Sequence, residues 1–213
     1  MTKKILLLLA DGFEPLEAAG FTDVMGWANL DGEVPIEVVS AGLHTTIGAT
    51  FAYRVQPDYL LADLQLSDFD AVAIPGGMER GGIHGGFYKD AYSEEFQDAI
   101  RHFSGHKQPV ASVCVASLAL GSAGILKDRR ATVYHQIGGN RKTELEAFGA
   151  NFIDNAIVKD QNIITSTGPG TSVEVAFELL AQLSSASNVR HIRQLMRIPT
   201  PSANWRETPQ VAI

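Results

Sequence analysis

The chain of 213 residues is short of cysteine, since Cys114 is the only one. A single thiol excludes an internal disulfide and any zinc site built from several cysteines, and it is typical of a reducing compartment. The glycine-rich stretch 76–86 (GGMERGGIHGG) lacks the lysine of a P-loop, and no Rossmann fingerprint follows the first apolar run. We therefore expect a protein with no nucleotide, no other cofactor and no metal ion.

Long apolar runs and excess positive charge are also missing. No segment approaches the ~20 apolar residues that a membrane-spanning helix needs. Residues 5–10 (ILLLLA) follow two lysines but are too short for a signal peptide. The net charge of −7 argues against nucleic acid or an anionic membrane as the main partner. We expect a cytoplasmic protein.

What the sequence does contain is an alternation of strand-like and helix-like segments. Six apolar runs are typical of buried strands: 4–10, 35–41, 70–76, 109–113, 131–134 and 162–166. Five other segments favour helices: 15–30, 93–105, 116–126, 140–149 and 171–184. The stretch 43–56 indicates a small hairpin. This order predicts an α/β fold with a mainly parallel sheet between two layers of helices.

The domain organisation is expected to be simple. No internal repeat and no linker interrupts the alternation, which predicts one domain over residues 1–197. The remaining residues, 198–213, contain three prolines and predict an extended tail lying on a surface.

Residues that could carry chemistry follow the predicted strands. In open α/β sheets, ligands bind beyond the carboxyl ends of the strands. Glycine, proline and aspartate are common there for structural reasons. That explanation does not cover Cys114 and His135, which follow the runs 109–113 and 131–134. A thiol and an imidazole at one sheet edge indicate a functional site.

Cys114 lies in SVCVAS, at a predicted turn from strand to helix. A nucleophile elbow uses such a turn to lift the reactive side chain above the sheet. The N-terminus of the following helix favours the thiolate, so we expect a lowered pKa for the thiol. The alternative is a structural cysteine, because free cysteines are among the most buried residues.

Glu17 is the predicted partner of this thiol. At 100° per residue, Phe13, Phe21, Val24 and Ala28 all lie within about 40° of Glu17 on the helix after DGFEP. An unpaired carboxylate on this apolar face would be costly. Burial should therefore raise the pKa of Glu17 and let a protonated carboxyl donate a hydrogen bond.

The other candidates are an imidazole and a set of backbone amides. His135 could form a Cys–His pair with the thiol, and His84, in the loop GGIHGGF, is a secondary candidate. An oxyanion hole commonly uses backbone donors. We expect Gly76 and Gly77 of PGG to bind the substrate oxygen together with the amide of Val115, which follows the nucleophile.

Taken together, these motifs resemble the ThiJ/PfpI superfamily, the class I glutamine amidotransferase-like group that contains the parkinsonism-associated protein deglycase. The similarity extends from about residue 4 to 184 and rests on five motifs: DGFEPLEAAGFTDVM, AIPGG, SVCVAS, ATVYH and STGPGTSVEVAFELL. The resemblance implies a flavodoxin-like fold, a site of Glu17, Cys114 and His135, and an anion pocket lined by Gly77 and Val115. It also implies a homodimer.

The resemblance implies a cysteine enzyme for small reactive carbonyls, similar to glutathione-independent glyoxalases or deglycases. The family's proteases typically carry histidine after the cysteine, where this chain has Val115, and its isocyanide hydratases typically carry aspartate where it has Glu17. Two alternatives stay open. One is another cysteine hydrolase or hydratase, and the other is a redox sensor or stress-protective protein in which Cys114 is oxidised.

Overall fold

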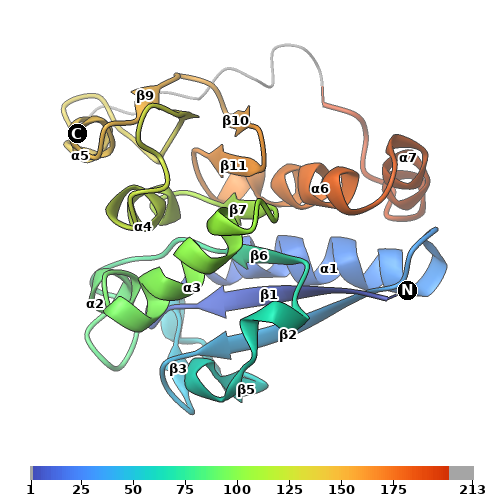
Figure 1. Cartoon of the computed structure of the whole chain (residues 1–213), viewed down its shortest axis with the longest axis horizontal. Helices are drawn as coiled ribbons and strands as arrows, with labels where there is room; N and C mark the ends of the chain where they lie inside the picture. The colour runs from blue at the N-terminus through green and yellow to red at the C-terminus, as the bar shows by residue number, and fades with distance from the viewer. Residues whose placement is uncertain (1, 202–213) are drawn as a thin grey trace.

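The structure is a computed structural model that describes residues 2–201. Its centre is a seven-stranded sheet, in which every neighbouring pair is parallel except the antiparallel pair at one edge (Figure 1). In spatial order the strands are β10 (Ile157–Asp160), β11 (Ile163–Ser166), β7 (Val110–Ser112), β6 (Ala71–Ile74), β1 (Lys3–Leu9), β2 (Ile36–Gly42) and β5 (Tyr59–Leu60). The predicted mainly parallel sheet is confirmed.

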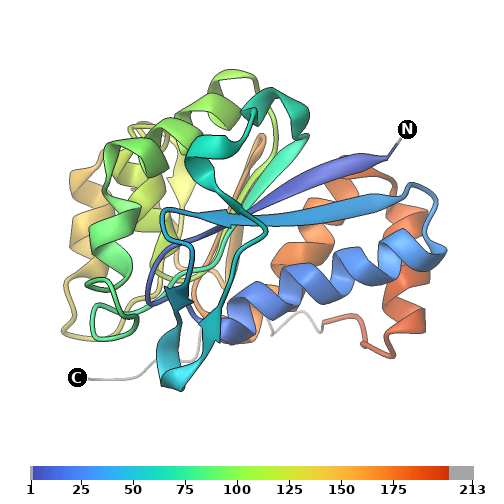
Figure 2. The same ribbon diagram turned by 90° about the horizontal axis from the view of Figure 1, so that it is seen from below.

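Helices cover both faces of this sheet (Figure 2). One layer holds α1 (Pro15–Asp31), α6 (Ser172–Leu183) and α7 (Ala186–Leu195), which pack against one another. The other holds α2 (Phe87–Ala91), α3 (Glu94–Gly105), α4 (Ala116–Ser122) and α5 (Arg141–Ala147). The three-layer, flavodoxin-like sandwich is therefore as predicted. None of the helices within residues 2–201 is long and apolar enough to span a membrane.

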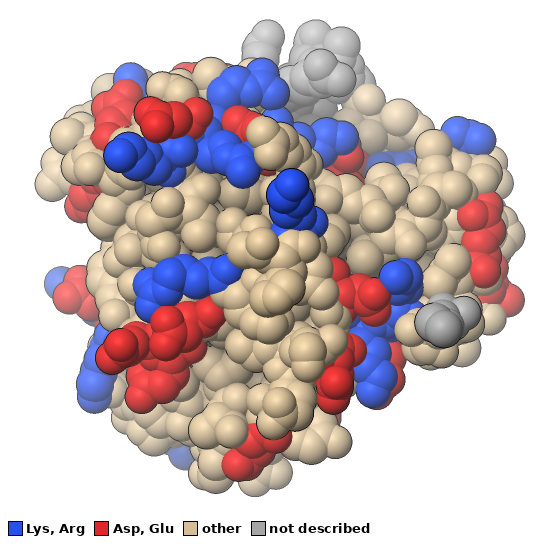
Figure 3. Space-filling model, viewed as in Figure 1, with Lys and Arg blue, Asp and Glu red and all other residues tan. Residues whose placement is uncertain are grey.

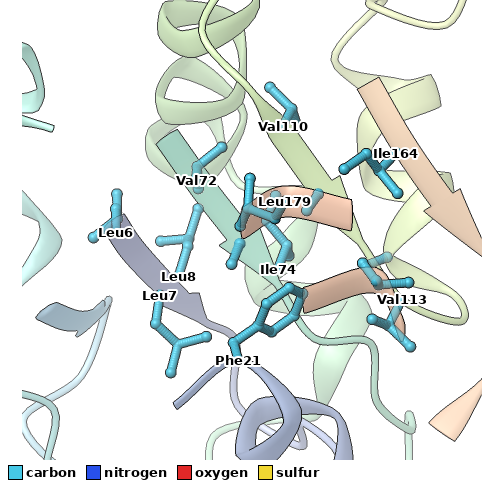
Figure 4. Close-up of a cluster of buried hydrophobic side chains, with 14 of the residues drawn as sticks. Leu6, Leu7, Leu8, Phe21, Val72, Ile74, Val110, Val113, Ile164 and Leu179 are labelled. Carbon is cyan, nitrogen blue, oxygen red and sulfur yellow. The ribbon is translucent and has the colours of Figure 1, made fainter. Parts of the chain in front are cut away.

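The core forms where the apolar strands meet the helix layers. Leu6 and Leu8 of β1 are fully buried, and they project from the opposite face of the strand to Leu7 (Figure 4). Both faces of β1 are buried, so its sequence is continuously apolar rather than alternating. Burying one such leucine stabilises the fold by roughly 1.5–3 kcal/mol. Phe21 of α1 and Leu179 of α6 complete the cluster.

One predicted strand does not belong to the central sheet. Within residues 131–134, only Ala131 is in a strand, β8 (Arg130–Ala131), which pairs with β9 (Asn151–Phe152) in a separate two-stranded sheet. The next backbone donors are used elsewhere: Thr132 N–H donates to the Thr165 side chain and Tyr134 N–H to the Cys114 carbonyl. These hydrogen bonds replace a ladder and guide the segment to the site.

The remaining elements differ less from those predicted from the sequence. The hairpin is confirmed, with β3 (Ile47–Gly48) antiparallel to β4 (Arg54–Val55). Neither α2 nor α7 was predicted. Helix α7 begins after Ser185, whose hydroxyl accepts a hydrogen bond from the backbone N–H of Asn188. Most of the predicted tail, residues 202–213, lies outside the described residues.

Candidate functional site

Cys114 lies between β7 and α4, in the elbow that the sequence predicts. Its φ of 60° is in the left-handed region, a strained conformation for a residue with a side chain. The surrounding backbone holds it there, because Cys114 N–H donates to Ser166 O at 3.0 Å and Cys114 O accepts from Tyr134 N–H at 3.3 Å. Strain maintained in this way is typical of functional sites.

A glycine is required beside the elbow. A Cβ on Gly76 would lie 2.9 Å from the Cys114 Cβ and 2.8 Å from the Val113 carbonyl oxygen. No rotamer can relieve a clash with backbone. The loop after β6 can therefore approach the thiol this closely only because residue 76 has no side chain.

Glu17 is fully buried on α1, as its helical position predicts. Its Oε2 accepts a hydrogen bond of 2.6 Å from the Gly76 N–H, while Oε1 has no nitrogen or oxygen partner within residues 2–201. The side chain of Cys114 is a hydrogen-bond partner that influences the pKa of this carboxyl, and the charge of Glu14 influences it as well. Burial raises the pKa of Glu17 to about 8, although the Gly76 amide and Cys114 oppose the shift. Glu17 is thus mainly protonated at neutral pH.

The expected lowering of the Cys114 pKa is wrong. Burial is the largest influence and raises the pKa of the thiol well above its ordinary value, and a negative charge on Glu17 raises it further. The Val115 N–H, at the start of α4, does lower it, as the elbow predicts, and so does the charge of Arg141. These influences are smaller than desolvation, because Cys114 is only 8% exposed.

The predicted amide donors are not equivalent. The Gly76 N–H is already bonded to Glu17, so it cannot also bind a substrate oxygen while that hydrogen bond lasts. The Val115 N–H acts on the sulfur of Cys114. The Gly77 N–H donates to no acceptor within the described part of the chain. Val115 is therefore the amide that the structure places at the sulfur, while Gly77, with an N–H that is free within residues 2–201, lies next to Gly76 in the loop after β6.

Each ring nitrogen of His135 lies close to an oxygen atom of another residue. Nδ1 lies 2.9 Å from the Val133 carbonyl oxygen, and Nε2 lies 3.1 Å from Oδ1 of Asp154. The edge of the imidazole also packs against Phe152. The contact with Asp154 is one of proximity, since Nε2 makes no hydrogen bond with any group in residues 2–201. His135 is not among the groups that act on Cys114, and it follows Tyr134, whose N–H donates to the Cys114 carbonyl. No sequence signal pointed to Asp154.

The secondary candidate, His84, belongs to a different cluster. Its ring stacks on His44 with a centroid separation of 3.9 Å, and its Nε2 lies 2.9 Å from the Thr46 carbonyl oxygen. It is not among the groups that act on Cys114. No group of three or more histidine, cysteine, aspartate or glutamate side chains within residues 2–201 is placed to hold a metal ion.

A pocket of about 610 Å³ lies between the α2 region and the segment leading into α5. Figure 1 shows α2, α4 and α5 gathered at the end of the molecule toward which β1 points, where an α/β sheet binds its ligands. The pocket is lined by Glu79, Tyr88, Tyr92, Gly138, Gly139, Asn140, Arg141 and Glu144. None of these was a sequence candidate, since nothing in the chain indicates that these two segments meet.

Residues 3–182 match the DJ-1/PfpI family. The chain belongs to this family. The relatives include Protein dj-1beta of Drosophila melanogaster, 29% identical over 90% of this chain and 95% of the relative. The crystal structure of Drosophila DJ-1beta superposes with a TM-score of 0.80, covering 94% of this chain and 100% of that one at 28% identity.

A plant member of the DJ-1/PfpI family is longer than this chain. Protein DJ-1 homolog A of Arabidopsis thaliana is 28% identical over the whole of this chain, which spans 54% of the plant protein. The family match confirms the resemblance inferred from the motifs.

The surface charge of the visible face is mixed. In Figure 3, acidic and basic side chains alternate over this face, unlike the broad basic patch of a nucleic-acid-binding surface.

Proposed function

We propose that this DJ-1/PfpI protein is a cysteine enzyme that converts α-oxoaldehydes such as methylglyoxal to hydroxy acids, without glutathione. The observation that carries the proposal is the buried pair of Glu17 and Cys114 at the elbow. A carboxyl with a pKa of about 8 titrates near physiological pH, where a group serves well as both base and acid.

The first steps form a covalent adduct. The carboxylate form of Glu17 accepts the thiol proton as the Cys114 sulfur attacks the aldehyde carbon. The carbonyl electron pair moves to oxygen, where the amides of Gly77 and Val115 stabilise the charge. Glu17 returns the proton to that oxygen, which gives a hemithioacetal and restores the carboxylate.

The remaining steps are an isomerisation and a hydrolysis. Glu17 removes the proton from the carbon bonded to sulfur and delivers it to the neighbouring carbon, while the hydroxyl proton passes to the second oxygen. The product is an S-lactoyl thioester. Water cleaves the thioester, releasing lactate and the Cys114 thiol. The overall reaction consumes one water for each methylglyoxal and needs no cofactor.

The test measures lactate rather than loss of methylglyoxal, because amines and thiols also consume this aldehyde without catalysis. Purified protein in an amine-free buffer should form one lactate for each methylglyoxal lost. Cys114→Ser and Glu17→Gln should each abolish lactate formation. Thr22→Ala, on the exposed side of α1, is the control. Lactate formation that persists in Cys114→Ser would refute the proposal.

A redox role is the second candidate, and the unpartnered Oε1 of Glu17 supports it. Two equivalents of peroxide would oxidise the thiol to a sulfinic acid with release of two waters, and a protonated Glu17 could donate a hydrogen bond to the product. Mass spectrometry after mild peroxide treatment distinguishes the candidates. Addition of two oxygens at Cys114, with no lactate formed, favours the sensor. A hydrolase would instead act on amides, esters or nitriles in a substrate panel.

We also propose a homodimer located in the cytoplasm. Analogy within the DJ-1/PfpI family supports the dimer, and two large apolar side chains, Leu30 and Phe51, are 75% and 76% exposed. Covering such side chains at a subunit interface would remove apolar surface from water. Light scattering of the wild type and of Phe51→Asp tests the assembly, and a monomeric wild type would refute it.

A further inference from the structure

The pocket between α2 and α5 contains a cation with unused hydrogen-bonding capacity. Arg141 makes one weak hydrogen bond, in which its Nε donates to the Tyr88 hydroxyl at 3.4 Å. It forms no ion pair with a carboxylate within residues 2–201. A guanidinium carries five N–H donors in a planar fork that matches a carboxylate. Most of these donors are therefore available to a ligand.

The setting of Arg141 favours ligand binding over a purely solvated role. Its side chain is half-buried, and its guanidinium carbon lies 5.6 Å from the centre of the Tyr134 ring. Tyr134 precedes His135 and bonds to the Cys114 carbonyl. The aromatic ring thus restricts the guanidinium on one side, and the pocket lies on another. A cation held in this way binds an anion with less loss of side-chain entropy.

Arg141 is linked to the elbow through Tyr134, because its guanidinium lies over the Tyr134 ring and the Tyr134 N–H donates to the Cys114 carbonyl at 3.3 Å. Its charge lowers the pKa of Cys114, and a charge on Cys114 in turn raises the pKa of Arg141. Tyr134 thus connects the cation of the pocket to the residue that carries the thiol.

The other charges in the pocket narrow the kind of anion. Glu79 and Glu144 also line it, and both are exposed to solvent. Solvent screens their repulsion of a single negative charge. A phosphate carries up to two negative charges at neutral pH and would be repelled more strongly. The pocket is thus better suited to a carboxylate than to a phosphate.

We propose that Arg141 binds the carboxylate of the substrate, and that the site prefers small aldehydes carrying a carboxylate, such as glyoxylate, to neutral aldehydes of similar size. The preference rests on the proposed function, because it assumes that Cys114 attacks a carbonyl. The binding of a carboxylate beside Cys114 does not depend on turnover. The two can therefore be tested separately.

The first experiment compares two alkylating reagents that react with Cys114 by the same displacement of iodide. Iodoacetate carries a carboxylate, and iodoacetamide is its neutral analogue. The ratio of their rate constants should fall about tenfold in Arg141→Met, because a charge-assisted hydrogen bond is lost. The control is Lys142→Met, which removes the same charge from the next residue. Lys142 instead lies over the Phe152 ring, 5.0 Å from its centre.

Each outcome decides the proposal. A ratio that falls in Arg141→Met alone supports it, and an unchanged ratio, or an equal fall in Lys142→Met, overturns it. Lactate formation together with an unchanged ratio would leave the proposed function standing without the carboxylate site. A fall in the ratio without any lactate formation would support the site and refute the function.

A second experiment keeps the proposal testable if the buried thiol resists both reagents. Calorimetric titration of Cys114→Ser with glyoxylate measures binding without a covalent adduct. The dissociation constant should rise about tenfold when Arg141→Met is added to this background. Inorganic phosphate is the second probe and should bind more weakly than glyoxylate. Equal glyoxylate affinity with and without Arg141, or tighter binding of phosphate, would overturn the proposal.

Discussion

Two carboxyl groups that lie only six residues apart in the sequence are both buried, but their pKa values are shifted in opposite directions. Asp11 and Glu17 are both fully inaccessible to solvent. Asp11 accepts hydrogen bonds from four backbone amides, those of Gly48, Ile83, His84 and Gly86. Burial tends to raise the pKa of Asp11, but these amides together hold it below its ordinary value. Glu17 accepts from one amide, and burial raises its pKa to about 8.

The comparison shows that the number of donors, not burial alone, decides the charge of an internal carboxyl. At Asp11, a permanent negative charge holds the hairpin and the loop after β6 together. At Glu17, one oxygen is left for the thiol and the carboxyl can exchange its proton near neutral pH. The first site has a structural role, and the second is suited to chemistry.

The largest effect on stability is expected for Asp11→Asn. An amide offers one acceptor oxygen, and its NH2 group would face backbone donors, so several buried N–H groups would lose their partner. We expect the free energy of unfolding at pH 7 to fall by about 3 kcal/mol or more. Urea unfolding measures it, with Asp23→Asn on the exposed side of α1 as the control. A loss no larger than that of the control would contradict the structural role of Asp11.

Glu17→Gln should have the opposite effect and raise the free energy of unfolding at pH 7. The pKa of Glu17 is about 8 in the folded protein and ordinary in the unfolded chain, so its stabilising contribution is complete below pH ~4.5 and is lost as pH rises toward 8. At pH 7 the loss amounts to about 3 kcal/mol. Glutamine needs no proton, so the variant should be more stable than the wild type at pH 7 by up to this amount.

Urea unfolding at pH 5, 6, 7 and 8 checks how the stability difference between the wild type and Glu17→Gln depends on pH. The stability of the wild type relative to Glu17→Gln should fall steadily over this range. Asp11 does not produce this slope, because its lowered pKa makes its contribution disappear only in acid, as pH falls through the folded-state pKa. A difference between wild type and variant that is independent of pH would show that Glu17 is ionised in the folded protein.

The smallest expected effect is a shift in the pKa of the Cys114 thiol. A negative charge on Glu17 raises the pKa of Cys114, so Glu17→Gln should lower that pKa, although burial will still hold it above the free value. Thiolate absorbance against pH measures it, and Cys114→Ser provides the baseline. Asp11→Asn should leave the midpoint unchanged. A higher midpoint in Glu17→Gln would indicate that the neutral carboxyl stabilises the thiolate by donating to it.

Much of the fold could be predicted because its signals are local. The run 4–10 is buried on both faces of β1, and the apolar face of α1 contains Glu17 as its periodicity indicates. The segment 131–134 shows the limit. Its residues favour a strand, but the Thr165 side chain and the Cys114 carbonyl accept the hydrogen bonds of two of its amides. Those acceptors are brought there by segments far away in the sequence.

The candidate site also has features that could be predicted from nearby residues and features that depend on distant segments. The elbow at Cys114 and the burial of Glu17 follow from nearby residues. The partners of His135 do not, since Asp154 lies in a different segment and is brought to the imidazole only by folding. The direction of the Cys114 pKa also could not be predicted. A helix N-terminus is visible in the sequence, whereas the desolvation that outweighs it depends on everything packed around the sulfur.

The sequence by itself determined the layered α/β sandwich, the family, the elbow and the internal position of Glu17, because periodicity and motif order report which residues must be buried together. Only the tertiary structure decided which amide is occupied, which oxygens lie beside the histidine and that Arg141 lies over the Tyr134 ring. Those properties depend on distances and directions between segments that are remote along the chain. Charge and hydrogen bonding act over a few ångströms, and only folding sets those separations.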